Sequence, residues 1–117
     1  MANGTKQQGQ DPIKKIIKKL HFSYKFYTRS YPDITHLDET SARAHFANTG
    51  IHEKRFCSIY HFFLEKKPEY AGSISIKKFR KHNKVPKHIS PLKTCELILS
   101  HLSHELQIFY IVFHQRN

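Results

Sequence analysis

The sequence predicts an α+β fold: a small, mostly helical single domain of three or four helices, with a two- or three-stranded sheet near the C-terminus. Residues 13–31, 52–67 and 90–106 carry apolar side chains at helical spacing. Residues 73–77 alternate in polarity like a half-buried strand, and residues 106–113 are apolar on both faces. Strand, helix and strand in that order indicate a small sheet covered by helices.

The first patterned segment begins with Asp11 as a candidate N-cap and Pro12 at the first helical position. Its apolar stripe is predicted to face the core and consists of Ile13, Ile16, Ile17, Leu20, Tyr24, Tyr27 and Tyr31. Phe22, Tyr24 and Phe26 also alternate as in a strand, so the helix is predicted only to about Leu20. Phe22 and Phe26 fall among cations on the wheel, where they could stack on bases, enter a lipid headgroup region or pack on a second layer.

The middle of the chain predicts two helices that meet at a glycine turn. Asp38 or Thr40 caps a short helix, Gly50 ends it, and a second helix begins near His52 and stops before Pro68. The arrangement resembles a helix-turn-helix, although any helical hairpin gives a similar pattern. The resemblance implies a groove-facing set of His52, Lys54, Arg55 and Ser58.

The last third predicts the sheet. Ile74 and Ile76 mark the first strand, residues 80–88 form a basic loop, and Ser90 with Pro91 opens a helix. The run 106–113 is too apolar for an open edge strand. We therefore expect a helix and neighbouring strands to enclose this run, or the run to pair with its symmetry mate in a homodimer.

Length and composition predict one basic domain over residues 12–117, after a disordered tail over residues 1–11. The chain has 117 residues and fifteen aromatic residues, nine Phe and six Tyr, which is sufficient for one packed interior. The sequence shows neither a membrane-spanning run nor the apolar region of a signal peptide, so we expect a cytoplasmic protein without a membrane partner. Cys57 and Cys95 lack a CxxC spacing, and we expect both to be reduced.

The net charge of +11 is concentrated in two segments, residues 14–29 and residues 77–87, and neither contains an acidic residue. Residues 30–70 between them hold five basic and six acidic residues, so the background is nearly neutral. Two segments of one sign favour a polyanionic partner, with two solvated basic faces as the alternative. The predicted nucleic-acid-binding residues are Lys14, Lys15, Lys18, Lys19, Lys25, Arg29, Lys54, Arg55, Lys77, Lys78, Arg80, Lys81, Lys84 and Lys87, with Phe22 and Phe26 as candidate stacking residues.

Catalytic and metal sites are less well supported by the sequence. Cys57 and His61 have the spacing of two ligands on one helix face, but no HExxH or CxxC motif accompanies them. His82 and His88 in the basic loop could form an acid-base pair, or could simply add charge in mild acid. Neither a nucleophile motif nor a phosphate-binding glycine loop is present, so the sequence predicts no enzyme and no cofactor.

Two functions of different classes remain. The first is a small non-enzymatic nucleic-acid-binding protein that contacts phosphates through its two basic segments. The second is a protein-interaction module, an inhibitor or adaptor, that binds an acidic partner protein. The charge pattern does not distinguish between these two functions. It also does not distinguish DNA from RNA as the ligand.

Overall fold

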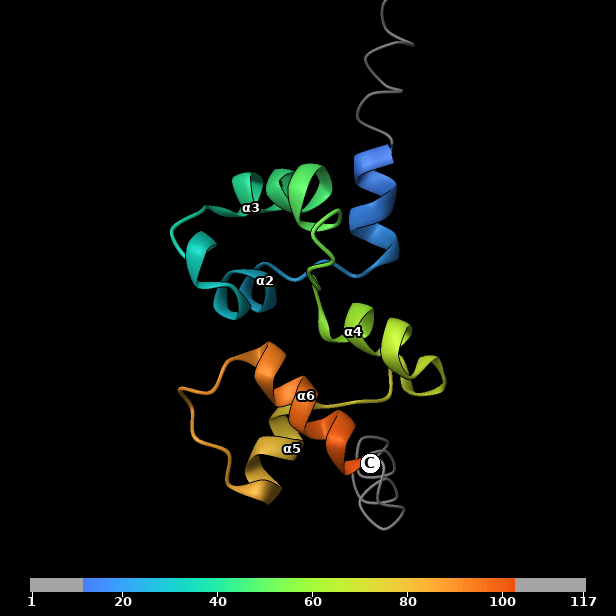
Figure 1. The fold of residues 1–117 in the computed structure, drawn as a ribbon, viewed down its shortest axis with the longest axis vertical. Helices are drawn as coiled ribbons and strands as arrows, with labels where there is room; N and C mark the ends of the chain where they lie inside the picture. Colours follow the sequence, from blue (N-terminus) through green and yellow to red (C-terminus); the bar gives the residue numbers. More distant parts are fainter. Residues whose placement is uncertain (1–11, 103–117) are drawn as a thin grey trace, which may run out of the picture.

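The computed structural model describes residues 12–102, which form six α-helices (Figure 1). The first helix covers residues 12–19 of the described chain. The others are α2 (Tyr24–Ser30), α3 (Glu39–His45), α4 (Ile59–Lys66), α5 (Ile76–Asn83) and α6 (Pro91–His101). Short 3-10 turns at Pro32–Ile34 and Pro68–Tyr70 and a π-helical turn at Phe46–Gly50 connect them.

The helix starts follow from the side chains that precede them. Each of α2 to α6 has an N-cap residue whose side-chain oxygen accepts a backbone N–H in the first turn. The caps are Ser23, Asp38, Ser58, Ser75 and Ser90, in chain order. The predicted caps Asp38 and Ser90 are thereby confirmed, and so is the end of α4 before Pro68.

The predicted α+β class is wrong, because residues 12–102 are helical and contain no strand. Residues 73–75 of the predicted first strand are irregular, and the hydroxyl of Ser75 accepts the amide of Lys78 and caps α5. Ile76 and Phe79 then share the inner face of an amphipathic helix, and Lys and Arg in the same stretch are good helix formers. The predicted second strand at 106–113, its pairing in a homodimer and the predicted tail 1–11 lie outside the described residues.

The glycine-turn arrangement differs from the helix-turn-helix interpretation. Residues 51–54 form turns, Lys54 adopts a left-handed backbone (φ 60°), and the second helix begins only at Ile59. Ser58 is 3% exposed, and its hydroxyl donates to the carbonyl oxygen of Leu20 at 2.6 Å. The segment 52–58 therefore does not present a helix to a DNA groove, and the predicted groove-facing set is not carried forward.

Two hydrophobic clusters form the core, and α2 contributes to both. In the ribbon, α2 lies between α3 and α6 (Figure 1). The N-terminal cluster has Tyr27, Ile34, Ala42, Phe46 and Cys57 at its centre. The C-terminal cluster has Phe26, Phe62, Phe63, Ile74, Phe79, Cys95, Ile98 and Leu102. Consecutive residues of α2 thus pack in opposite directions, with Phe26 entering one cluster and Tyr27 the other. The predicted apolar stripe of the first helix contributes Ile16, Ile17 and Leu20 to the N-terminal cluster, where they are half-buried.

The π-helical turn makes room for Tyr27. A Cβ atom at Gly50 would overlap the hydroxyl oxygen of Tyr27, so glycine is required here by close approach. The Tyr27 hydroxyl is hydrogen-bonded to Nδ1 of His45 at 2.7 Å. Burial raises the pKa of Tyr27 to about 12, so this phenol stays neutral.

Candidate nucleic-acid interface

The first helix presents its lysines to solvent. Lys14, Lys15, Lys18 and Lys19 are all exposed, as predicted for the face opposite the isoleucines. The helix lies against α3 across a groove of about 490 Å³, named here the first-helix groove. Its lining residues are Ile13, Lys14, Ile17, Glu39, Thr40, Arg43 and Ala44. The groove therefore has an apolar floor with cations at its rim.

Phe22 and Phe26 lie in different environments. Phe26 is 4% exposed and belongs to the C-terminal cluster, so its ring has no surface on which a base could stack. Phe22 is half-buried and packs against Tyr27 and Phe46, with ring centroids 5.6 and 6.0 Å apart. It also lines a cavity of about 460 Å³ beside Lys14, Lys18, His21 and Arg43. Only Phe22 remains a candidate stacking residue.

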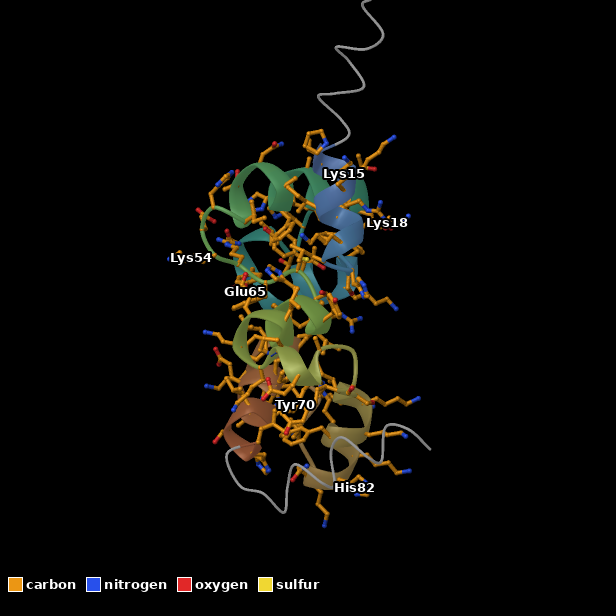
Figure 2. The ribbon with its side chains drawn as sticks, turned by 90° about the vertical axis from the view of Figure 1, so that its right-hand side faces the viewer. Lys15, Lys18, Lys54, Glu65, Tyr70 and His82 are labelled. Carbon is orange, nitrogen blue, oxygen red and sulfur yellow. The ribbon has the colours of Figure 1, made fainter. Side chains whose placement is uncertain are left out.

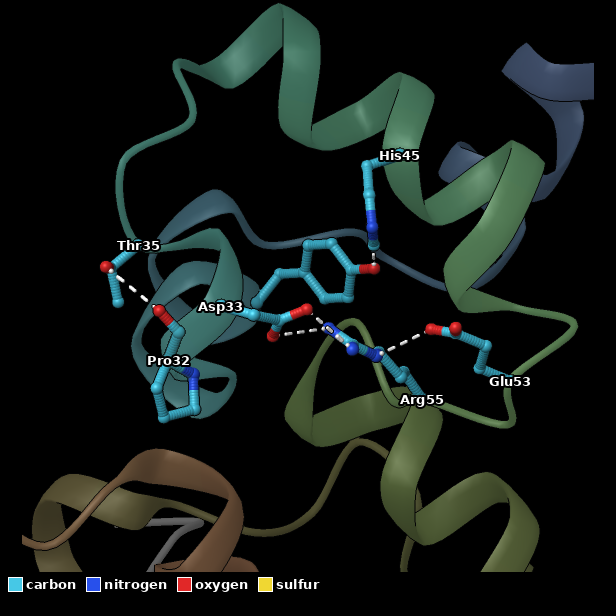
Figure 3. A network of polar contacts seen from close by, with 7 residues as sticks. Pro32, Asp33, Thr35, His45, Glu53 and Arg55 are labelled. Carbon is cyan, nitrogen blue, oxygen red and sulfur yellow. Dashed lines mark hydrogen bonds and ion pairs between the residues drawn. The ribbon is translucent and has the colours of Figure 1, made fainter.

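Arg55 holds the N-terminal half together (Figure 3). Its two terminal nitrogens donate to the two carboxylate oxygens of Asp33 at 2.9 and 2.8 Å, and Nε lies 3.0 Å from Glu53. The guanidinium also covers the ring of Tyr31 at 4.7 Å. Hydrogen bonding to Arg55 holds the pKa of Asp33 below its usual value. The guanidinium nitrogens of Arg55 are engaged within the protein. Arg55 is therefore not proposed as a nucleic-acid contact.

Lys54 is exposed but lies apart from the first-helix lysines. Figure 2 shows Lys54 and Lys18 projecting toward opposite edges of the molecule. The same view places the first helix and α5 along one long side, one near each end. Lys54 therefore does not extend the surface that the first helix and α5 share.

The second basic segment forms α5 and the loop that follows it. Lys77, Lys81, Lys84 and Lys87 are exposed, whereas Lys78 and Arg80 are half-buried. Lys84 ends α5 in a left-handed conformation with φ 53°, and this turns the chain into the loop toward α6. In the first segment, Lys25 and Arg29 are exposed on α2. All of the predicted cations thus keep at least part of their side chains accessible.

The two basic segments meet at one cavity, named here the arginine pocket. It has a volume of about 320 Å³ and is lined by Arg29, Thr35, Arg80, Lys87, His88, Ile89, Ser90 and Pro91. Arg29 belongs to the first segment, whereas Arg80 and Lys87 belong to the second. No acidic residue of the described chain lines the pocket. Its electrostatic potential is therefore positive and favours an anion.

Hydrogen bonds hold the walls of the pocket in place. Arg80 donates from a terminal nitrogen to the carbonyl oxygen of Ile89 at 2.8 Å, which fixes the loop against α5. The amide of Leu92 donates to Oγ of Ser30 at 3.1 Å and joins the start of α6 to the end of α2. The amides of Lys93 and Thr94 donate to Ser90. Because these first-turn amides of α6 are satisfied, the side chains and not the helix terminus make the pocket attractive to an anion.

Arg80 carries a polar atom that lacks a partner. Its Nε has less than 1 Å² of exposed surface and makes no hydrogen bond in the structure. No ion pair joins Arg80 to an acidic side chain within residues 12–102. A half-buried guanidinium without a counter-charge is electrostatically unfavourable, and a bound anion would offset that cost.

Cys57 and His61 are occupied by structural contacts. Nδ1 of His61 accepts the amide of Cys57 at 3.1 Å, and its Nε2 lies 3.5 Å from Glu65. Burial raises the pKa of the Cys57 thiol to about 12, which disfavours the thiolate needed for metal binding or nucleophilic attack. Residues 12–102 contain no group of three or more His, Cys, Asp or Glu side chains that could hold a metal ion.

Comparison of the chain with known protein families, curated proteins and solved structures found no match. Within the described part of the chain, no helix has the length and apolar character needed to cross a membrane.

Sequence reasoning missed several residues that the structure places at these sites. Arg43 is an isolated cation on α3, yet it faces both cavities beside the first helix. Thr35 and His88 line the arginine pocket. The position of His88 in the basic loop could have identified it, whereas Arg43 and Thr35 lie outside both basic segments.

Proposed function

We propose that this protein is a small, non-enzymatic, cytoplasmic nucleic-acid-binding protein that contacts phosphates through its two basic segments. The observation that carries the proposal is the arginine pocket, where Arg29 of one segment joins Arg80 and Lys87 of the other without an acidic neighbour in the described chain. The two basic segments are distant in the sequence, so their contact at one pocket is a consequence of the fold. Guanidinium and ammonium groups at one concave surface match the chemistry of phosphate recognition.

The exposed lysines of the first helix and α5 extend this cationic surface. Figure 2 shows the first helix and α5 along one long side of the molecule, so a nucleic acid that follows this side would meet both helices. Lysines of this kind act as point charges that contact phosphates and carry no direct sequence information. We therefore expect binding that depends strongly on salt and weakly on sequence.

Salt titration tests the proposal. With six to eight phosphate contacts, the logarithm of the affinity for duplex DNA should fall with the logarithm of salt concentration at a slope of about −5 to −7. Lys14→Gln combined with Lys18→Gln should reduce the steepness of that slope by about 2. A salt-independent affinity would exclude binding through phosphates.

Lys66→Gln combined with Lys93→Gln is the matched control. It removes the same two charges from exposed positions on α4 and α6, outside both basic segments. The slope of this control should stay close to that of the wild type. An equal loss in the control would show that net charge matters and the proposed surface does not.

The first-helix groove favours a second candidate function, a protein-interaction module that binds an acidic partner. Its apolar floor contains Ile13 and Ile17, and Lys14 and Arg43 stand at its rim. An acidic amphipathic helix would complement such a surface. A peptide of that kind should bind in a way that Ile13→Ser abolishes and Arg29→Gln leaves unchanged.

A further inference from the structure

We infer that the arginine pocket binds a terminal phosphate monoester, the group at the end of a nucleic acid strand. The inference rests on the proposed function and names the chemical group that this pocket takes. It starts from the shape and size of the pocket. At about 320 Å³, the pocket lies at the lower end of the roughly 300 to 1,000 Å³ typical of small-ligand sites. This space suits one compact group better than a length of duplex.

The charges in the pocket match a dianion. Arg29, Arg80 and Lys87 bring three permanent positive charges, and His88 adds a further side chain able to donate a hydrogen bond, whereas the Thr35 hydroxyl donates to the carbonyl oxygen of Pro32 at 3.2 Å. A phosphate monoester carries a charge of about −1.5 to −2 at pH 7 and presents three strong acceptor oxygens. A phosphodiester within a strand carries one charge and is attached on both sides. The terminal group therefore satisfies more of the pocket's donors and can enter it end-on.

Arg80 makes binding of an anion in the pocket more favourable than binding of water. One of its terminal nitrogens is held by the carbonyl of Ile89, which fixes the orientation of the planar guanidinium. No acidic side chain within the described residues forms an ion pair with the Arg80 guanidinium. A fixed guanidinium can form paired hydrogen bonds to phosphate oxygens, and it loses little side-chain entropy when it does so.

The other basic surfaces formed by residues 12–102 lack this combination. The first-helix groove is lined by Glu39 as well as by cations, and Glu39 pairs with Arg43 at 2.8 Å. Arg55 is engaged by Asp33 and Glu53. Among the cavities described above, the arginine pocket alone brings cations of both basic segments together.

The test compares single-stranded oligonucleotides of one sequence that end in a 5′-phosphate, a 3′-phosphate or hydroxyls only. Fluorescence anisotropy with the full chain measures their affinities at one fixed ionic strength. We expect one phosphorylated form to bind about tenfold more tightly than the hydroxyl form, since charge-assisted hydrogen bonds to the extra oxygens are strong. Arg29→Gln and Lys87→Gln should each reduce that preference, because each removes a positive charge from the pocket. Both side chains are exposed, so neither change should unfold the protein.

Lys66→Gln is the matched control, since it removes the same charge far from the pocket and should keep the preference. Equal affinity for all three oligonucleotides, with the salt dependence retained, would overturn the inference while leaving the proposed function standing. Absence of binding to every oligonucleotide would overturn both.

Inorganic phosphate distinguishes the end of a strand from a free anion. We expect it to compete with the phosphorylated oligonucleotide only at much higher concentration, because it gains nothing from the surrounding lysines. If phosphate alone raised the melting temperature in an Arg29-dependent way while the three oligonucleotides bound equally, the pocket would be a site for free phosphate and the inference would be wrong.

Discussion

The N-terminal half of the described chain combines aromatic packing with side-chain hydrogen bonds and ion pairs, whereas the C-terminal half depends on an almost entirely apolar cluster. In the first half, Tyr27 bonds to His45 and Arg55 joins Asp33 to Glu53. In the second half, α4, α5 and α6 meet through Phe62, Phe63, Phe79 and Ile98. Specific polar geometry therefore positions the first half, and area removed from water stabilises the second.

The two halves also present their basic segments differently. The first helix displays its four lysines at exposed positions, while the second segment half-buries Arg80 and builds a pocket from the loop after α5. Each segment holds six basic residues and no acidic residue. Equal charge thus produces two kinds of surface, one suited to general attraction and one to holding a single anionic group.

Removal of the Phe26 ring should have the largest effect, because α2 inserts this ring into the C-terminal cluster. Phe26→Ala should lower the free energy of unfolding by about 3 to 5 kcal/mol, as expected for a buried phenylalanine. Phe22→Ala should cost less, because that ring is half-buried. Chemical denaturation of both variants measures the difference. Unchanged stability together with lost nucleic-acid binding in Phe26→Ala would restore its role as a stacking residue and contradict the two-cluster description.

Gly50→Ala should perturb the N-terminal half by an intermediate amount. The added methyl group would overlap the Tyr27 hydroxyl and force either the π-helical turn or the tyrosine ring to move. We expect a loss of about 1 to 3 kcal/mol, the usual range for overpacking. Gly72→Ala is an informative comparison, because its added atom would meet only Tyr60 at 4.0 Å and its cost would come from backbone strain at φ 86°.

If the Gly50 and Gly72 variants lost equal stability, close approach to Tyr27 would not be the deciding factor. Combining Gly50→Ala with Tyr27→Phe separates the cost of steric overlap from the cost of replacing glycine in the backbone. Removing the hydroxyl should relieve part of the overlap, so the two changes together should cost less than their sum.

The smallest expected effect is a pH dependence that originates at His61, where the two halves meet. Burial lowers the pKa of His61 in the folded protein, and the opposing influence of Glu65 is weaker. An unfolded chain therefore binds a proton at this residue more readily than the folded chain does. Stability is fully present above the unfolded value of 6.5 and falls as the pH drops from there toward the lower folded pKa.

Urea denaturation between pH 8 and pH 5 should show this loss in the wild-type protein. His61→Gln keeps an acceptor for the Cys57 amide but does not titrate, so its stability should vary less with pH over that interval. His52→Gln alters an exposed histidine and should retain the wild-type pH dependence. Identical pH dependence in all three proteins would assign the effect to other groups.

The sequence by itself determined the local features of this protein. Asp38 and Ser90 could be recognised as caps because their side chains satisfy amides within a few residues along the chain. The stripe of isoleucines and the opposite face of lysines in the first helix followed from helical periodicity. Both predictions needed only neighbours in the sequence.

Only the tertiary structure decided the rest. Ile74, Ser75 and Ile76 alternate like a strand, yet the Ser75 cap and the packing of Phe79 make the following segment a helix. Phe26 falls among cations on a single-helix wheel, but a second layer formed by α4 and α6 buries it. The arginine pocket likewise depends on α6 docking against α2 through Leu92 and Ser30. Contacts between distant segments select among conformations that local preferences leave close in free energy, because burial of large apolar side chains outweighs the small differences in local propensity.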